Sequence, residues 1–159
     1  MKSKFFLALA ILALGLWPTL ALAEVKTFDQ FTVDIPLGWS TEFKAGDSEG
    51  FGANLFVSKE DQSAMVSYTL EKLKAGQWEA MLKEMTEHPK SDTGPAEIKS
   101  DNSFLVTFND NRSGMTGREI YHRVNSDMYV KEVVIGYADD MHVILGSFQV
   151  SKREEQPQP

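Results

Sequence analysis

Cysteine is absent from the 159 residues of this sequence. Its absence excludes disulfides, thiolate nucleophiles, cysteine-ligated metals and a lipid-modified N-terminal cysteine. A folded domain must therefore be stabilised by an ordinary apolar core. The composition, with 42% hydrophobic and 25% charged residues, is that of a globular protein, and the length suits one domain.

Positive charge is also scarce. Sixteen Lys and Arg residues stand against 23 Asp and Glu residues, which gives a formal net charge of −7 at pH 7. A field of this sign repels phosphate backbones and anionic lipid headgroups, so we expect no nucleic-acid partner.

The N-terminus has the pattern of a bacterial export signal. Lys2 and Lys4 precede an apolar run at residues 5–16, and Ala21-Leu22-Ala23 is the small-x-small pattern that signal peptidase reads. We predict a signal peptide at residues 1–23, cleaved after Ala23, and a periplasmic or secreted protein. The run is short for a membrane span, so none is expected after cleavage. The alternative is a leader retained as an anchor.

The first structured stretch of the mature chain follows the leader closely. Phe31, Val33 and Ile35 alternate with polar residues, which predicts a strand with one buried face. Pro36 ends this strand because it has no N–H to donate. Trp39 comes directly after the turn, where it can fold back over the core.

The rest of the chain predicts a mostly antiparallel sheet with one clear helix. Residues 24–29 are expected to be a lead-in and residues 41–50 a polar loop. Trp78, Met81, Leu82 and Met85 have helical spacing, which predicts an amphipathic helix from near Gly76 to His88. Further strands are expected at residues 51–58, 64–72, 97–100, 104–108, 115–124, 128–137 and 142–150.

These elements give an α+β fold class, an antiparallel sheet with flanking helices. Residues 51–58 and 64–72 are expected to form a hairpin, and the later strands a meander. The run at residues 142–150 also fits a helix. We assign residues 24–150 to a single domain and residues 151–159 to a disordered polar tail.

The first strand and its turn resemble the start of the PsbP-like superfamily, which includes PsbP, the DcrB-type periplasmic proteins and the Ran-binding protein Mog. The resemblance covers residues 28–150. It implies an α/β/α sandwich and a module that binds other macromolecules without a recognised active site. No functional residue is carried over, because the matching positions are structural. These positions are Phe31, Val33, Ile35, Pro36, Gly38 and Trp39, with Ser147 and Phe148 matching the end of the domain.

Metal sites have weak support. His122 and His142, with Asp139 or Asp140, form one hypothesis for a two-histidine, one-carboxylate site. Ordinary surface or partly buried strand histidines are the favoured interpretation. The stretch at residues 109–114 has some features of a calcium loop, but Ile120 stands where a bidentate glutamate is needed.

Catalytic patterns are missing from the sequence. It has no Gly-x-Ser-x-Gly or Ser-x-x-Lys motif and no glycine-rich phosphate loop, so we expect neither an enzyme nor a cofactor. Basic residues on the late strands form a candidate patch for a ligand or partner, and cross-strand pairing with Glu119 and Glu132 is the alternative. The candidate patch comprises Trp39, Arg112, Arg118, Arg123 and Lys131.

These observations lead to one favoured function and two alternatives. The favoured hypothesis is an exported, non-catalytic binding or adaptor module that engages a protein partner in the bacterial cell envelope. The first alternative is a periplasmic protein that binds a small molecule or metal through residues 41–50 or the basic patch. The second is a hydrolase with a dispersed site. The sequence leaves the oligomeric state open.

Overall fold

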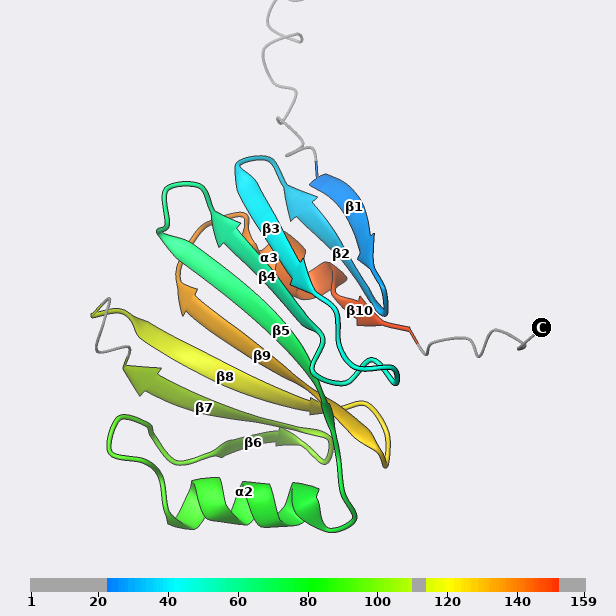
Figure 1. Ribbon diagram of the computed structural model, residues 1–159. Helices are drawn as coiled ribbons and strands as arrows, with labels where there is room; N and C mark the ends of the chain where they lie inside the picture. The colour runs from blue at the N-terminus through cyan, green and yellow to red at the C-terminus, as the bar shows by residue number, and fades with distance from the viewer. Residues whose placement is uncertain (1–22, 110–113, 152–159) are drawn as a thin grey trace, which may run out of the picture.

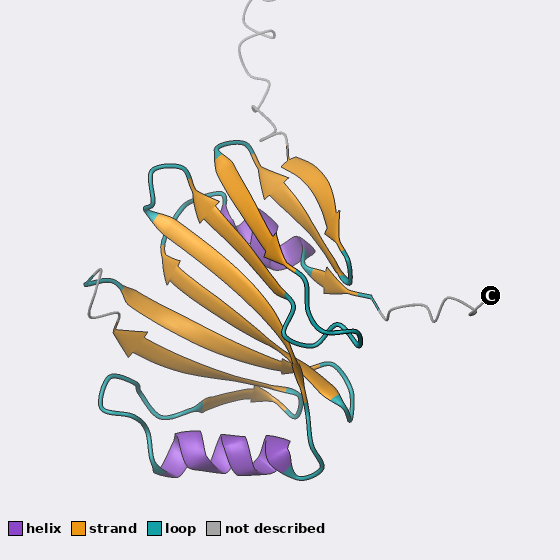
Figure 2. Ribbon diagram, viewed as in Figure 1, coloured by secondary structure: helices purple, strands orange, loops and turns teal. Residues whose placement is uncertain are grey.

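The computed structural model describes residues 23–109 and 114–151. These residues form two antiparallel sheets and two helices (Figures 1 and 2). The larger sheet has the strand order β3-β4-β5-β9-β8-β7-β6. In that order the bounds are Trp39–Lys44, Asn54–Lys59, Ala64–Lys72, Met128–Gly136, Thr116–Arg123, Ser103–Asn109 and Glu97–Ser100.

The smaller sheet places β2 between β1 and β10. The bounds of these strands are Ala23–Phe28 for β1, Phe31–Pro36 for β2 and Gln149–Val150 for β10. Two helices complete the described fold, α2 at Gln77–Glu87 and α3 at Met141–Ser147. Figure 1 shows α2 beside β6, while α3 lies behind β3 and β4 at the other end of the large sheet.

The two helices cover opposite faces of the large sheet. Val66 on β5 pairs with Val134 on β9, and both belong to the core that β2 and α3 cover, so we call this side the α3 face. Tyr121 on β8 points to the other side, where Phe104 lies 5.1 Å from Trp78 of α2 between ring centroids. We call that side the α2 face.

Each face is therefore covered over only part of its width. On the α3 face, Thr107 of β7 and Arg118 of β8 are exposed. On the α2 face, Ser40 and Glu42 of β3 are exposed, and Phe56 of β4 is 37% exposed. On each side of the large sheet the fold buries an apolar layer. The strands beyond that layer leave polar or partly apolar side chains exposed to solvent.

The short helix α3 is fixed to the sheet by aromatic packing. Phe148, directly after α3, stacks on Tyr68 of β5 with centroids 3.6 Å apart and an interplanar angle of 2°. The Tyr68 hydroxyl donates to the Ile144 carbonyl oxygen at 3.5 Å, and Ile144 is fully buried. A helix of seven residues is not stable alone in water, so these contacts hold it in place.

A partly buried ion pair ties the start of α3 to strand β4 of the large sheet. Lys59 Nζ of β4 lies 2.8 Å from Oδ2 of Asp140, which is the residue before α3. The same ammonium lies 5.3 Å from the ring centroid of Trp39, which is 6% exposed. The predicted return of Trp39 over the core is confirmed by this burial.

Several sequence predictions are confirmed. The strands at residues 64–72 and 97–100 match β5 and β6, and the helix predicted up to His88 matches α2. The β4–β5 hairpin and the antiparallel meander from β6 to β9 are also present. Alternation predicted β5, and helical spacing predicted α2, because each of these elements buries one face.

The α/β/α sandwich is wrong. The described residues are 51% strand and 14% helix, and neither helix forms a layer across a whole face of the sheet. The fold is mostly β, and the α+β class describes it poorly. The physical reason is that β2 and β10, rather than a layer of helices, cover much of the hydrophobic core on the α3 face.

Two local predictions are also corrected, and a third, left open between strand and helix, is resolved. The lead-in at residues 24–29 is largely strand β1, whose outer side chains are exposed and so gave no alternating signal. The loop predicted at residues 41–50 begins only after Lys44, where β3 ends, and the next strand begins at Asn54 rather than residue 51. The run at residues 142–150 is a helix followed by a two-residue strand.

The predicted signal peptide and tail lie almost wholly outside the described residues. Ala23 begins β1, and Ser151 donates its backbone N–H to the Gln30 carbonyl oxygen at 2.9 Å. Within the described part of the chain, neither helix has the length and apolar composition needed to cross a membrane.

Truncating Ile144 tests the packing of α3. The variant Ile144→Ala should lose about 2–5 kcal/mol of unfolding free energy, because it leaves a cavity beneath the helix. The matched control is Gly146→Ala on the same helix, where an added methyl group meets no atom within 4 Å. Urea denaturation followed by tryptophan fluorescence measures both. Equal losses in the two variants would contradict the packing described.

Candidate functional site

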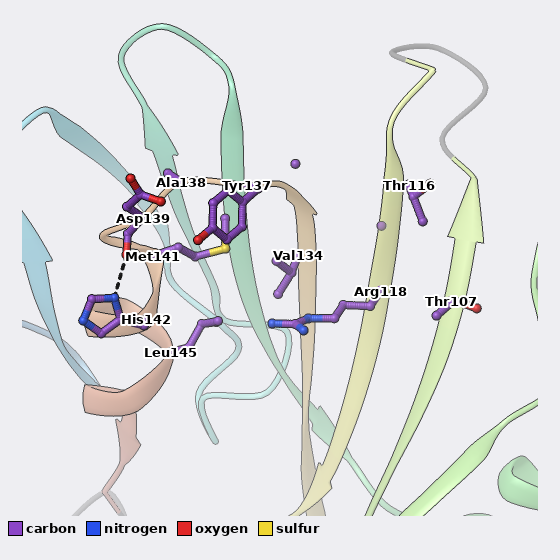
Figure 3. A pocket seen from close by; sticks show the side chains of 12 residues that line it. Thr107, Thr116, Arg118, Val134, Tyr137, Ala138, Asp139, Met141, His142 and Leu145 are labelled. Atoms are coloured by element: carbon purple, nitrogen blue, oxygen red, sulfur yellow. Dashed lines mark hydrogen bonds between the residues drawn. The ribbon is translucent and has the colours of Figure 1, made fainter.

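A hollow lies between α3 and the open part of the α3 face. Its volume is about 420 Å³, and Figure 3 shows α3 on one side and strands β7 to β9 on the other. We call it the α3 groove. The side chains of Thr107, Thr116, Arg118, Val134, Tyr137, Ala138, Asp139, Met141, His142 and Leu145 line it.

Strand register and one glycine assemble the groove. Arg118 lies opposite Thr107 on β7 and opposite Val134 on β9, so the three side chains form a row across the sheet. Gly136 then turns the chain away from β9 with φ of +72°. A Cβ atom there would meet the Ser63 carbonyl oxygen at 2.0 Å, so the turn into α3 requires glycine.

Arg118 is the cation of the groove. Figure 3 shows its side chain reaching from β8 across the sheet toward Leu145, below Val134. Among the described residues, no ion pair within salt-bridge distance includes Arg118. Its guanidinium is thus available to an acceptor from outside the described chain.

Glu132 is the acid nearest in register to this cation. It lies opposite Tyr68 on β5 and Ile120 on β8, one step along the α3 face from Arg118, and it is 6% exposed. Burial raises the pKa of Glu132 to about 7, and attraction to Arg118 opposes that rise. The charge of Glu132 therefore changes near neutral pH.

The rim of the groove is polar. The His142 ring places Nδ1 2.7 Å from the Asp139 carbonyl oxygen, which can only accept, so Nδ1 carries the proton. A hydrogen bond to the Asp139 carboxylate raises the pKa of Tyr137, whose side chain is 75% exposed. These contacts brace the loop that precedes α3 and leave the entrance open to solvent.

The predicted basic patch does not form one surface. Trp39 is buried under Lys59, far along the sheet order from Arg118. Arg123 and Lys131 point to the α2 face, where Arg123 Nη1 lies 3.4 Å from Glu79 Oε1 of α2. Arg112 lies outside the described residues. Of the patch residues that the structure describes, Arg118 lines the groove.

The described residues give no geometric support to the metal-site hypotheses. Within residues 23–109 and 114–151, no three His, Asp or Glu side chains are grouped as a metal site would require. Asp140 is paired with Lys59, and His142 lies in α3 while His122 lies on β8. The calcium-like stretch falls partly outside the described residues.

The polar segment before β4, also a candidate ligand loop, closes on itself. Asp47 Oδ1 accepts the backbone N–H groups of Glu49 and Phe51 at 2.9 and 3.0 Å. Lys72 Nζ lies 2.7 Å from Glu49 Oε2. Through these contacts the segment forms a folded turn beside the sheet, in which its own polar groups bind one another.

Sequence reasoning missed the apolar wall of the groove. Val134, Met141 and Leu145 come from β9 and α3, and their convergence depends on the tertiary placement of that helix. Glu132 had a usable signal, since it stands between Val130 and Val134 at a position that alternation assigns to the core. A carboxylate in such a position marks a buried ionisable group.

Comparison with known proteins identifies no relative. No protein-family model matches this sequence, and no curated protein matches it. The resemblance to the PsbP-like superfamily therefore stays a prediction.

Glu132 should make stability fall as pH rises. Its pKa of about 7 in the fold exceeds the ordinary 4.5, so its contribution is full below pH 4.5 and is lost as pH rises to about 7. The shift corresponds to about 3 kcal/mol. Glu132→Gln removes this component, so the variant should exceed the native protein in stability at pH 8. Urea midpoints at pH 5 and pH 8 measure this. An unchanged pH dependence in the variant would refute it.

Proposed function

We propose that this chain is an exported, non-catalytic binding module that engages a protein partner in the bacterial cell envelope. The observation that carries the proposal is the α3 groove, where the guanidinium of Arg118, in no ion pair within residues 23–109 and 114–151, lies beside apolar side chains. The export part rests on the pattern of residues 1–23, and the binding role agrees with what the PsbP-like resemblance implies.

The groove has the chemistry of a recognition site. A guanidinium offers several N–H donors in a planar fork, and this fork matches a carboxylate better than it matches a neutral group. The side chains of Val134 and Met141, which line the same groove, are each only 4% exposed and supply an apolar wall beside the exposed cation. A charged contact beside such packing contributes more than the same contact in open solvent.

Photo-crosslinking tests the proposal in cells. A photo-crosslinking amino acid in place of Tyr137, at the rim, should give one dominant adduct with an envelope protein. The same amino acid in place of Glu87, exposed on α2, is the matched control and should not give that adduct. Adding Arg118→Ala to the Tyr137 variant should remove most of it. An adduct indifferent to position and to Arg118 would contradict the proposal.

A small-molecule ligand is the second candidate. The volume of the groove, about 420 Å³, falls within the range of small-molecule sites. A ligand that binds only the folded protein raises the melting temperature. A rise with phosphate, citrate, octanoate or divalent metals that Arg118→Ala abolishes would favour this candidate. A panel without any rise favours the protein partner.

A further inference from the structure

We infer that the α3 groove receives the C-terminal end of the partner's chain, with the terminal carboxylate on Arg118 and an apolar last side chain against α3. The inference rests on the proposed function, because it names the part of the partner that enters the groove. It follows from the charge, the shape and the polar groups of the groove.

Charge complementarity selects a carboxylate. Arg118 offers a full positive charge on the α3 face of a chain whose formal net charge is −7. The titratable groups near it in register are Glu132 on β9, Tyr68 on β5 and His122 on its own strand. The loop before α3 and α3 itself add Tyr137, Asp139 and His142 to the lining of the same groove. Partial burial lowers the pKa of His122, so at neutral pH it adds little positive charge. The site therefore suits one anionic group of one charge.

The wall of the groove suits an apolar side chain next to that anion. Val134 lies directly opposite Arg118 in the β8–β9 register, and Met141 and Leu145 face the same hollow from α3. Leu145 and Arg118 line the same hollow, from α3 and from β8 (Figure 3). A ligand with its carboxylate on Arg118 thus brings the atoms next to the carboxylate against these apolar groups. The last residue of a peptide has this arrangement.

The far side of the groove favours a peptide over a hydrocarbon chain. Thr107 and Thr116 line it from β7 and β8, and both are exposed. The Thr116 hydroxyl donates to Asn109 Oδ1 at 3.3 Å, a long hydrogen bond. Peptide N–H and C=O groups would satisfy these hydroxyls, whereas an alkyl chain would cover them without replacing their bonds to water.

Glu132 sets the direction of a pH effect on binding. When Glu132 is charged it competes with the incoming carboxylate for Arg118, and when it is protonated this competing negative charge is absent. Binding of a carboxylate therefore favours the protonated state of Glu132, and affinity should rise as pH falls. Arg118 and Glu132 substitutions should consequently change affinity in opposite directions.

Fluorescence anisotropy with short peptides tests the inference on the purified protein. The probes are fluorescein-labelled hexapeptides that end in Ala, Leu or Phe, each made with a free carboxylate and with a C-terminal amide. We expect the Leu or Phe acid to bind at least tenfold more tightly than its amide. Arg118→Ala should cause a similar loss. Lys131→Ala, a basic residue on the opposite face, is the matched control and should change nothing.

The pH arm uses the same peptides at pH 6 and pH 8. The native protein should bind the free acid about tenfold more tightly at pH 6. Glu132→Gln should bind at pH 8 as tightly as the native protein does at pH 6. Circular dichroism confirms that each variant is folded before its affinity is compared.

Each contrary outcome overturns a defined statement. Equal binding of acid and amide, or no peptide binding at all, overturns the C-terminal inference. If octanoate binds more tightly than every peptide, the C-terminal inference is overturned and the ligand is a small carboxylic acid. The Tyr137 crosslink is independent of these peptides, so an Arg118-dependent adduct with no C-terminal preference would preserve the proposed function and reject this inference alone.

Discussion

The contact between Tyr68 and Phe148 is the interaction on which the groove depends. The two rings stack at 3.6 Å between centroids, and the Tyr68 hydroxyl reaches the carbonyl of Ile144. Together with the burial of Ile144 and the Lys59–Asp140 ion pair, they hold a seven-residue helix that would not be stable alone in water. Because α3 forms one side of the groove, loss of this contact would remove the wall that makes Arg118 part of a site.

The position of the groove follows from the width of the sheet. Seven strands are too many for the small sheet and α3 to cover, and α2 covers the opposite face over β7 and β8. The cover on the α3 face therefore stops at β9. Glu132 and Arg118 lie at that boundary, one buried and the other exposed. A buried acid near an exposed cation has a shifted pKa, and such groups are typical of functional sites.

Much of the fold could be predicted from the sequence, because strands that bury one face have a visible period of two. The prediction failed where that period is absent, as in β1, or where polar residues surround it, as in β3 after Trp39. The site was less accessible. Arg118 was predicted as a ligand residue. Arg123 lies an odd number of residues from it on β8, and Lys131 of β9 pairs with Tyr121, so both of these side chains face the opposite side of the sheet. The pairing of β5 with β9, which places α3 beside Arg118, depends on long-range contacts.

An NMR titration of the isotopically labelled protein with a peptide acid ending in Leu would test the central claim most directly. The Nε–H signal of Arg118 reports on its guanidinium, and backbone amides report on each strand. The account predicts that the Arg118 signal shifts together with amides of β8, β9 and α3. Changes confined to the exposed part of the α2 face at β3 and β4, with Arg118 unmoved, would contradict it.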